Sequence, residues 1–151
     1  MMSGAVSYEL FAERMGSGNI GFTPEGGIFQ TFVNNTGNSV KGTIVVASTS
    51  VDNAVDIAPG DSPMPIGIIY ENGISNGNPV KVVTSGKAAV LLKDDEPAAR
   101  GNWCGVSDIT GRMMQKATAP STTEHYREIG HSLENKNSGT DVLALVSLHF
   151  N

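Results

Sequence analysis

Apolar residues along the chain fall into short runs that are separated by residues typical of turns. Runs rich in β-branched residues favour strands, and Asn-Gly pairs between such runs are a strong signal for hairpins. Asn72-Gly73 and Asn76-Gly77 supply two of these pairs. On either side of these two pairs the sequence predicts four strands: Lys41–Ala47, Ile66–Tyr70, Pro79–Thr84 and Ala88–Leu92. We expect Ser85-Gly86 to form a tight turn between the last two.

The clearest alternation of apolar and polar positions lies in the last predicted strand, Thr140–Phe150. Successive side chains of a strand point to opposite faces of the sheet. One face of this strand therefore carries Val142, Ala144, Val146, Leu148 and Phe150. We expect it to form a hairpin with Tyr126–Leu133, and we expect Trp103–Ser107 to pair with Arg112–Ala117 in the same way.

Helical signals are short and few. Asp94–Gly101 begins with acidic residues and ends with glycine, which favours a single capped helical turn. Asp56–Pro65 contains three prolines and is expected to be a connection, because proline is excluded from central strands. With about eight short strands and turn signals every ~8–12 residues, the pattern predicts an all-β fold. We expect a small antiparallel barrel or sandwich with an extended N-terminal arm and at most one or two short helical turns.

The first 38 residues differ from the rest of the chain because they are rich in aromatic residues and glycine and lack regular periodicity. We interpret residues 1–38 as an N-terminal arm and residues 39–151 as the β-barrel or sandwich domain. The arm either wraps its own domain or lies on a neighbouring molecule. Its aromatic side chains are the candidate anchors for a partner, because large rings bury the most area at an interface. They are Tyr8, Phe11, Phe22, Phe29 and Phe32.

Composition and charge exclude several classes of protein. The chain has 151 residues with a formal net charge of −5, so binding to nucleic acid gains nothing from release of counterions. A single cysteine allows no internal disulfide. No apolar run approaches the ~18 residues of a membrane span, and the first ten residues lack the features of a signal peptide. We therefore expect no contact with nucleic acid or membrane.

The sequence predicts no catalytic centre and no cofactor. Cys104 lies in a predicted strand and is interpreted as a buried small hydrophobe. Gly86-Lys87 lacks the remaining residues of a phosphate-binding loop. Asp94, Asp95 and Glu96 are explained by the start of a helical turn, although carboxylates also bind hard cations.

His125, Glu128 and His131 are spaced so that a helix would gather them as metal ligands. On the predicted strand, however, His125 and His131 share a face and Glu128 points to the other one. We therefore predict no metal site, and we interpret these histidines as surface or interface residues.

Four segments carry a resemblance to a known family. They are KGTIVVASTSVDNAVDIAPGDSPMPIGIIYENG from Lys41, NPVKVVTSGKAAVLL from Asn78, GNWCGVSDITGRMMQ from Gly101 and REIGHSLENKNSGTDVLALVSLHFN from Arg127. Together they resemble the decoration, or cement, proteins and small head proteins of tailed phages. That resemblance implies a homotrimer that binds the major capsid protein on the outside of the expanded head and stabilises it. It also implies a location on the virion after synthesis in the host cytoplasm.

Two other functions compete with this expectation. One is a binding module on the virion surface, such as the base of a head fibre or a glycan-binding β-domain. Glycan sites usually present an exposed aromatic side chain, and Trp103 is the only tryptophan in the sequence. The other is a metal-assisted hydrolase using His125, Glu128 and His131, which requires these side chains to converge.

Overall fold

The computed structural model describes residues 19–150, which form a β-rich body with one short helix. The strands are β1 (Ile20–Phe22), β2 (Gly27–Asn34), β3 (Ile44–Ala47), β4 (Ala54–Ile57), β5 (Gly67–Ile69), β6 (Pro79–Leu91), β7 (Trp103–Val106), β8 (Met113–Lys116), β9 (Glu128–Ser132) and β10 (Leu143–Leu148). The helix is α2 (Thr122–His125). The all-β prediction is confirmed, and no helix in residues 19–150 is long and apolar enough to span a membrane.

One half of the body is a small barrel. The ladder runs β2-β4-β3-β5-β6, and β6 pairs with β2 again, so these strands close on themselves. All of these pairings are antiparallel except β2–β4, which is parallel. Inside the barrel lie Val45, Val55, Ile69, Val80 and Val82, packed against Phe32, Ile66 and Ile74. Closure leaves no open edge on these strands where they pair.

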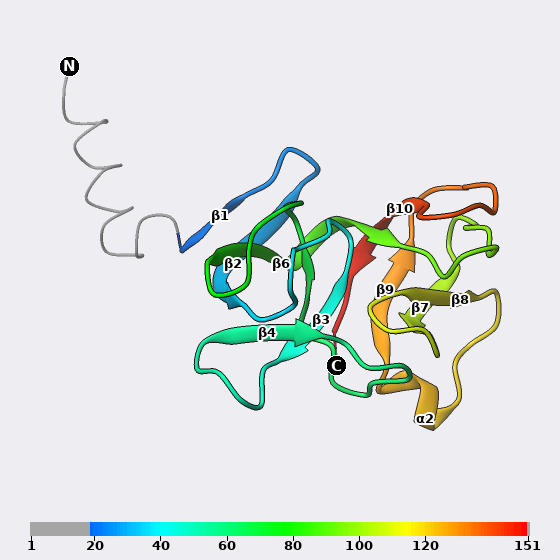
Figure 1. The fold of residues 1–151 in the computed structure, drawn as a ribbon. Coiled ribbons are helices and arrows are strands. Elements are labelled where there is room, and N and C mark those ends of the chain that lie inside the picture. The colour runs from blue at the N-terminus through cyan, green and yellow to red at the C-terminus, as the bar shows by residue number, and fades with distance from the viewer. Residues whose placement is uncertain (1–18, 151) are drawn as a thin grey trace, which may run out of the picture.

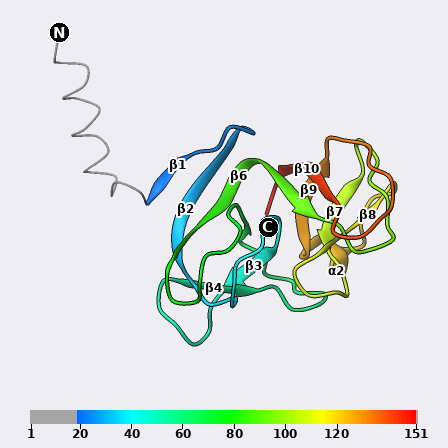
Figure 2. The ribbon, with the colours of Figure 1, turned by 45° about the horizontal axis from the view of Figure 1, so that its top comes forward.

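The other half of the body is an antiparallel sheet in the order β6-β10-β9-β7-β8. Figures 1 and 2 show it beside the barrel, with β1 at the far side of the barrel and α2 below β9 and β7. A second and larger hydrophobic cluster joins the two halves. This larger hydrophobic cluster includes Ile44 and Ile68 from the barrel and Ala144 and Val146 from β10. The predicted alternation of the last strand and both predicted hairpins, β7–β8 and β9–β10, are confirmed.

The turn predicted at Ser85-Gly86 is wrong, because β6 continues through it as a single strand of 13 residues. Ser85 and Gly86 pair with Ile28 and Gly27 of β2, and a register shift beside them bends the strand. The first part of β6 belongs to the barrel, and the last part, Lys87–Leu91, pairs with β10. A bulge bends a strand and increases its twist, so the Ser-Gly signal marks a change of sheet here instead of a reversal.

The described part of the predicted arm, residues 19–38, belongs to the body. β2 pairs with β6 along Gly27–Val33, and the side chain of Asn34 is buried. Of the two alternatives for the arm, this part therefore follows the first, in which the segment packs on its own domain. Tyr8 and Phe11 lie outside the described residues.

Two further local predictions need correction. Asp94–Gly101 contains no helix; its carboxylate Asp94 instead pairs with Arg112 at 3.0 Å, and Arg112 also binds Asp141. Within Asp56–Pro65, the first two residues belong to β4, which pairs with β3. The proline-containing remainder is a connection, as predicted.

Candidate functional sites

The described aromatic residues of the predicted partner surface have different environments. Phe22 is 82 % exposed, whereas Phe29 packs against the larger hydrophobic cluster and has the Lys81 ammonium 5.1 Å from its ring centroid. Phe32 packs against the cluster inside the barrel. Among the candidate anchors that the structure describes, only Phe22 therefore offers its ring to a partner, while Phe29 and Phe32 contribute to the fold.

Phe22 lies on a strand with an open edge. β1 stands at one end of the strand order and pairs only with β2 among the described residues. The Thr31 N–H donates to the Asn19 carbonyl at 2.8 Å, and the Thr23 N–H donates to the Gly27 carbonyl at 2.9 Å. Backbone groups alternate in direction along an antiparallel strand, so the N–H and C=O groups of Ile20 and Phe22 point away from β2. This edge can accept one more strand.

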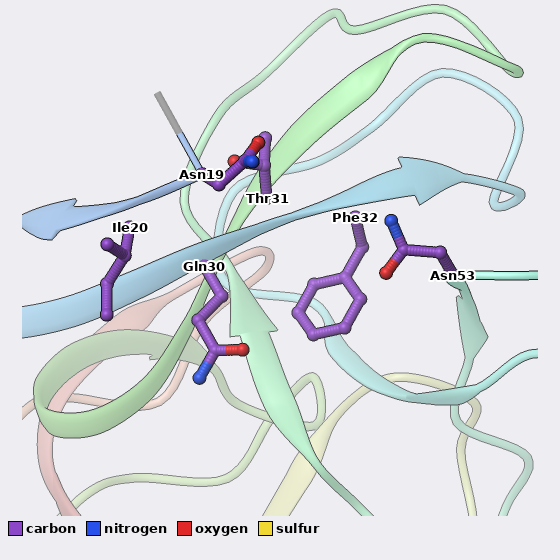
Figure 3. A pocket seen from close by; sticks show the side chains of 6 residues that line it. All are labelled: Asn19, Ile20, Gln30, Thr31, Phe32 and Asn53. Carbon is purple, nitrogen blue, oxygen red and sulfur yellow. The ribbon is translucent and has the colours of Figure 1, made fainter. Parts of the chain in front are cut away.

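A hollow of about 400 Å³ adjoins this edge where β1 begins and β4 starts along β2. Amide side chains line it together with the ring of Phe32, and Figure 3 shows that ring beside Asn53. The lining residues are Asn19, Ile20, Gln30, Thr31, Phe32 and Asn53. Amides donate and accept hydrogen bonds, so this surface suits an extended backbone better than a charged ligand.

A second site lies at the other end of the strand order, on the face of β7 and β9 that is turned away from the core. The register pairs Trp103 with His131 and Gly105 with Glu128. These residues share one face, whereas Cys104 and Val106 point into the larger hydrophobic cluster. Each residue of β7 is buried, so both faces of this strand are covered.

Strict alternation along the strand predicts Glu128 on the face opposite to His131, and this prediction is wrong. A register shift between Cys104 and Gly105 leaves Ile129 without a partner on β7. One additional residue in a strand reverses the alternation beyond it. As a result Glu128 and His131 lie on the same face although an odd number of positions separates them.

The segment after β8 closes this face and completes a pocket of about 250 Å³. Its lining residues are Gly101, Trp103, Lys116, Ala117, Thr118, Ala119, Pro120, His125, Glu128 and His131. This segment leads into α2, whose N-terminus is capped by the Ser121 side chain, and the Ser121 backbone N–H donates in return to the Glu124 carboxylate. His125, Glu128 and His131 meet around one pocket, which the strand pattern alone did not predict.

We call residues 117–121, between β8 and α2, the lid segment. Electrostatic contacts at its two ends hold it over the pocket. Lys116 Nζ lies 2.7 Å from Glu124 Oε2, and the Ser121 backbone N–H donates to the same carboxylate at 2.8 Å. The Lys116 hydrogen bond, helped by Ser121, lowers the pKa of Glu124 to about 2. The carboxylate is therefore ionised over the ordinary pH range and links β8 to the start of α2.

Two of the residues that line the pocket each carry a buried polar atom without a hydrogen-bond partner. Glu128 is 4 % exposed and its Oε2 is unpartnered, and Trp103, also 4 % exposed, has an unpartnered Nε1. The closest cation to Oε2 is His125 Nδ1 at 3.4 Å, an ion pair only when the imidazole is protonated. A buried donor or acceptor without a partner costs about 1–3 kcal/mol. The pocket is therefore suited to a group that satisfies both atoms.

The remaining candidates for chemistry are accounted for. Among residues 19–150 no group of three histidine, cysteine, aspartate or glutamate side chains is arranged to hold a metal ion. Cys104 is buried, as predicted, and burial raises the pKa of its thiol to about 12. A thiol with so high a pKa is a poor nucleophile at neutral pH.

Comparison of the chain with protein-family models finds no match, and comparison with curated proteins finds no similar sequence.

Proposed function

We propose that the protein decorates the outside of a virus capsid, binding the major capsid protein through the open edge of β1. The observation that carries the proposal is the combination of outward backbone groups at Ile20 and Phe22 with the 82 % exposed ring of Phe22. A strand of the partner adds to this edge through main-chain hydrogen bonds, and the ring buries apolar area against it. The neighbouring amide-lined hollow receives the partner's continuing chain.

The resemblance to phage decoration proteins adds trimerisation to this proposal. A single added strand with one aromatic anchor is a weak contact. Three such contacts on one trimer become strong together, because the second and third form within the same complex. A capsid repeats the same surface many times, so all three subunits of a trimer can bind to it at once.

The test is cosedimentation of the full-length protein with expanded heads that lack it. We expect Phe22→Ser to weaken binding at least about tenfold, as for an interface hot spot. Met64→Ser is the matched control, because Met64 is 69 % exposed and lies outside both candidate sites. Equal binding by the two variants contradicts the proposal.

A second pair of variants isolates the strand edge. Ile20→Pro removes an outward N–H but leaves the hydrogen bonds to β2, because proline lacks a donor and is accepted on edge strands. Ile20→Thr changes the side chain and keeps the N–H. We expect binding to fall for proline and to persist for threonine; the same loss in both variants argues against strand addition.

Tyr8 and Phe11 require a separate truncation. Removing residues 1–32 would delete β1 and most of β2, so its effect on binding would reflect loss of the fold. Removing residues 1–18 leaves every described strand in place. We expect this truncation to reduce binding to expanded heads while the circular dichroism of the body stays unchanged; full retention of binding restricts the partner surface to the β1 edge.

A binding module on the virion surface is the second candidate function. The specific observation in its favour is the pocket around Trp103 and Glu128, at the opposite end of the strand order from β1.

A further inference from the structure

We propose that the pocket between β7, β9 and α2 binds a neutral hydroxyl-bearing ligand, a single sugar ring. The site is distinct from the β1 edge: β1 and β8 are the two ends of the strand order, and Figures 1 and 2 show them on opposite sides of the body. The inference therefore does not depend on the capsid proposal.

The chemistry of the two unpartnered atoms selects the ligand. The unpartnered carboxylate oxygen of Glu128 is a hydrogen-bond acceptor, and the indole N–H of Trp103 only donates. A hydroxyl group does both, so hydroxyls on one small ligand satisfy the two atoms together. An ammonium or guanidinium group has no acceptor for the indole N–H. A phosphate or carboxylate has no donor for Glu128 and is repelled by its charge.

The walls of the pocket suit one sugar ring. Ala117, Ala119 and Pro120 supply apolar surface, while His131 is exposed at the rim. The volume of about 250 Å³ is below the ~300–1,000 Å³ typical of sites for drug-sized ligands. Trp103 is itself buried, so it acts as a hydrogen-bond donor and not as an exposed stacking platform.

Two residues at the pocket are under strong constraints: Gly130 has no room for a side chain, and Glu128 is a buried acidic residue. A Cβ on Gly130, which has φ of +146°, would lie 1.8 Å from the Ser147 carbonyl oxygen. Only glycine fits at this point, which follows the bulge that turns Glu128 towards the pocket. A charged side chain buried without a full set of partners destabilises a fold, and such groups concentrate at binding sites.

The single tryptophan supplies a direct measurement. In a ¹⁵N-correlated NMR spectrum the chain has one indole N–H signal, that of Trp103. Glucose, galactose, mannose and N-acetylglucosamine are titrated into the full-length protein in the millimolar range, with glycerol and Zn²⁺ as separate arms. We expect at least one sugar to shift this signal saturably, and glycerol to shift it far less.

Variants locate the effect. Glu128→Gln keeps the volume of the side chain and removes its charge, and we expect it to weaken sugar binding at least about tenfold. Glu96→Gln, outside the pocket, is the matched control and should bind as the wild type does. Because Glu128→Gln can also affect folding, His131→Ala at the exposed rim provides a second variant, expected to weaken binding while the rest of the spectrum is retained.

Several results would overturn the proposal. If no sugar shifts the indole signal saturably, the pocket holds water only. If Zn²⁺ at stoichiometric amounts perturbs the signal and His131→Ala abolishes this effect, the site is a metal site. If Glu128→Gln and Glu96→Gln bind sugar equally, the sugar lies elsewhere.

Discussion

The indole of Trp103 occupies the space that a side chain on Gly105 would need. A Cβ built on Gly105 would lie 2.3 Å from Cη2 of Trp103, although the two residues are only two positions apart on β7. They share the outward face of the strand, and the absent side chain lets the ring lie down along it. This arrangement buries Trp103 beside Glu128 and shapes one wall of the pocket.

Gly105→Ala is expected to destabilise the protein by about 2 kcal/mol, because the added methyl group displaces a packed ring. Chemical denaturation followed by far-UV circular dichroism measures the loss. The control is the same substitution in a Trp103→Ala background, where the methyl group has room. A similar loss in both backgrounds would show that the ring does not cause the effect.

Acid should release the lid segment from β8. The pKa of Glu124 is lowered to about 2 from its usual 4.5 by Lys116 and Ser121. A depressed pKa means that the carboxylate contributes stability above the unfolded value, and that this contribution is lost as pH falls from about 4.5 to about 2.

In Lys116→Met the pKa of Glu124 should rise towards 4.5, since the Lys116 hydrogen bond is the largest cause of its lowering. NMR titration of the Glu124 carboxyl measures this directly. Lys136→Met, which removes a cation 3.6 Å from Glu134 instead, is the control and should leave the pKa of Glu124 in place. An unchanged pKa in Lys116→Met would contradict the role of Lys116.

The thiol of Cys104 should resist modification in the folded protein. Burial raises its pKa to about 12, so almost no thiolate forms at pH 8. We expect no reaction with an aromatic disulfide reagent until the protein is unfolded in denaturant, when one thiol per chain reacts. Rapid reaction under native conditions would mean that β7 opens readily.

The exposed and the packed phenylalanines should separate binding from stability. Phe22→Ala is expected to change the free energy of unfolding by less than about 0.5 kcal/mol, as for other exposed positions. Phe32→Ala should cost about 2 kcal/mol, because the ring packs on the valines inside the barrel. Urea denaturation of both variants tests this, and equal losses would contradict the different environments of the two rings.

Local signals predicted much of the fold. The alternation over Val142–Phe150 predicted the face of β10 that enters the core, because a strand buried on one face must repeat with a period of two. Runs of β-branched and apolar residues predicted β3 and β5, and the turn segments Asp108–Gly111 and Asn135–Gly139 predicted the two late hairpins. β4 was missed because it is short and joins a proline-rich connection, and its strand is defined by pairing with distant β2 and β3.

The candidate site was visible in the sequence only in part. The spacing of His125, Glu128 and His131 drew attention to them, but strict alternation put Glu128 on the wrong face. Neither the spacing nor the composition signalled that Trp103 would lie in the same pocket. β7 pairs with β9, but β8 and α2 separate these two strands in the chain.

The order of apolar and polar residues thus determined that this chain forms strands, and which face of the last strand is buried, since both depend on near neighbours. Tertiary structure decided that β6 passes from barrel to sheet without a turn, that the barrel closes through β2, and that Glu128 is buried without a full set of partners. Each of these depends on pairing between strands distant in the chain, where one unpaired residue such as Ile129 reverses the direction of the side chains that follow.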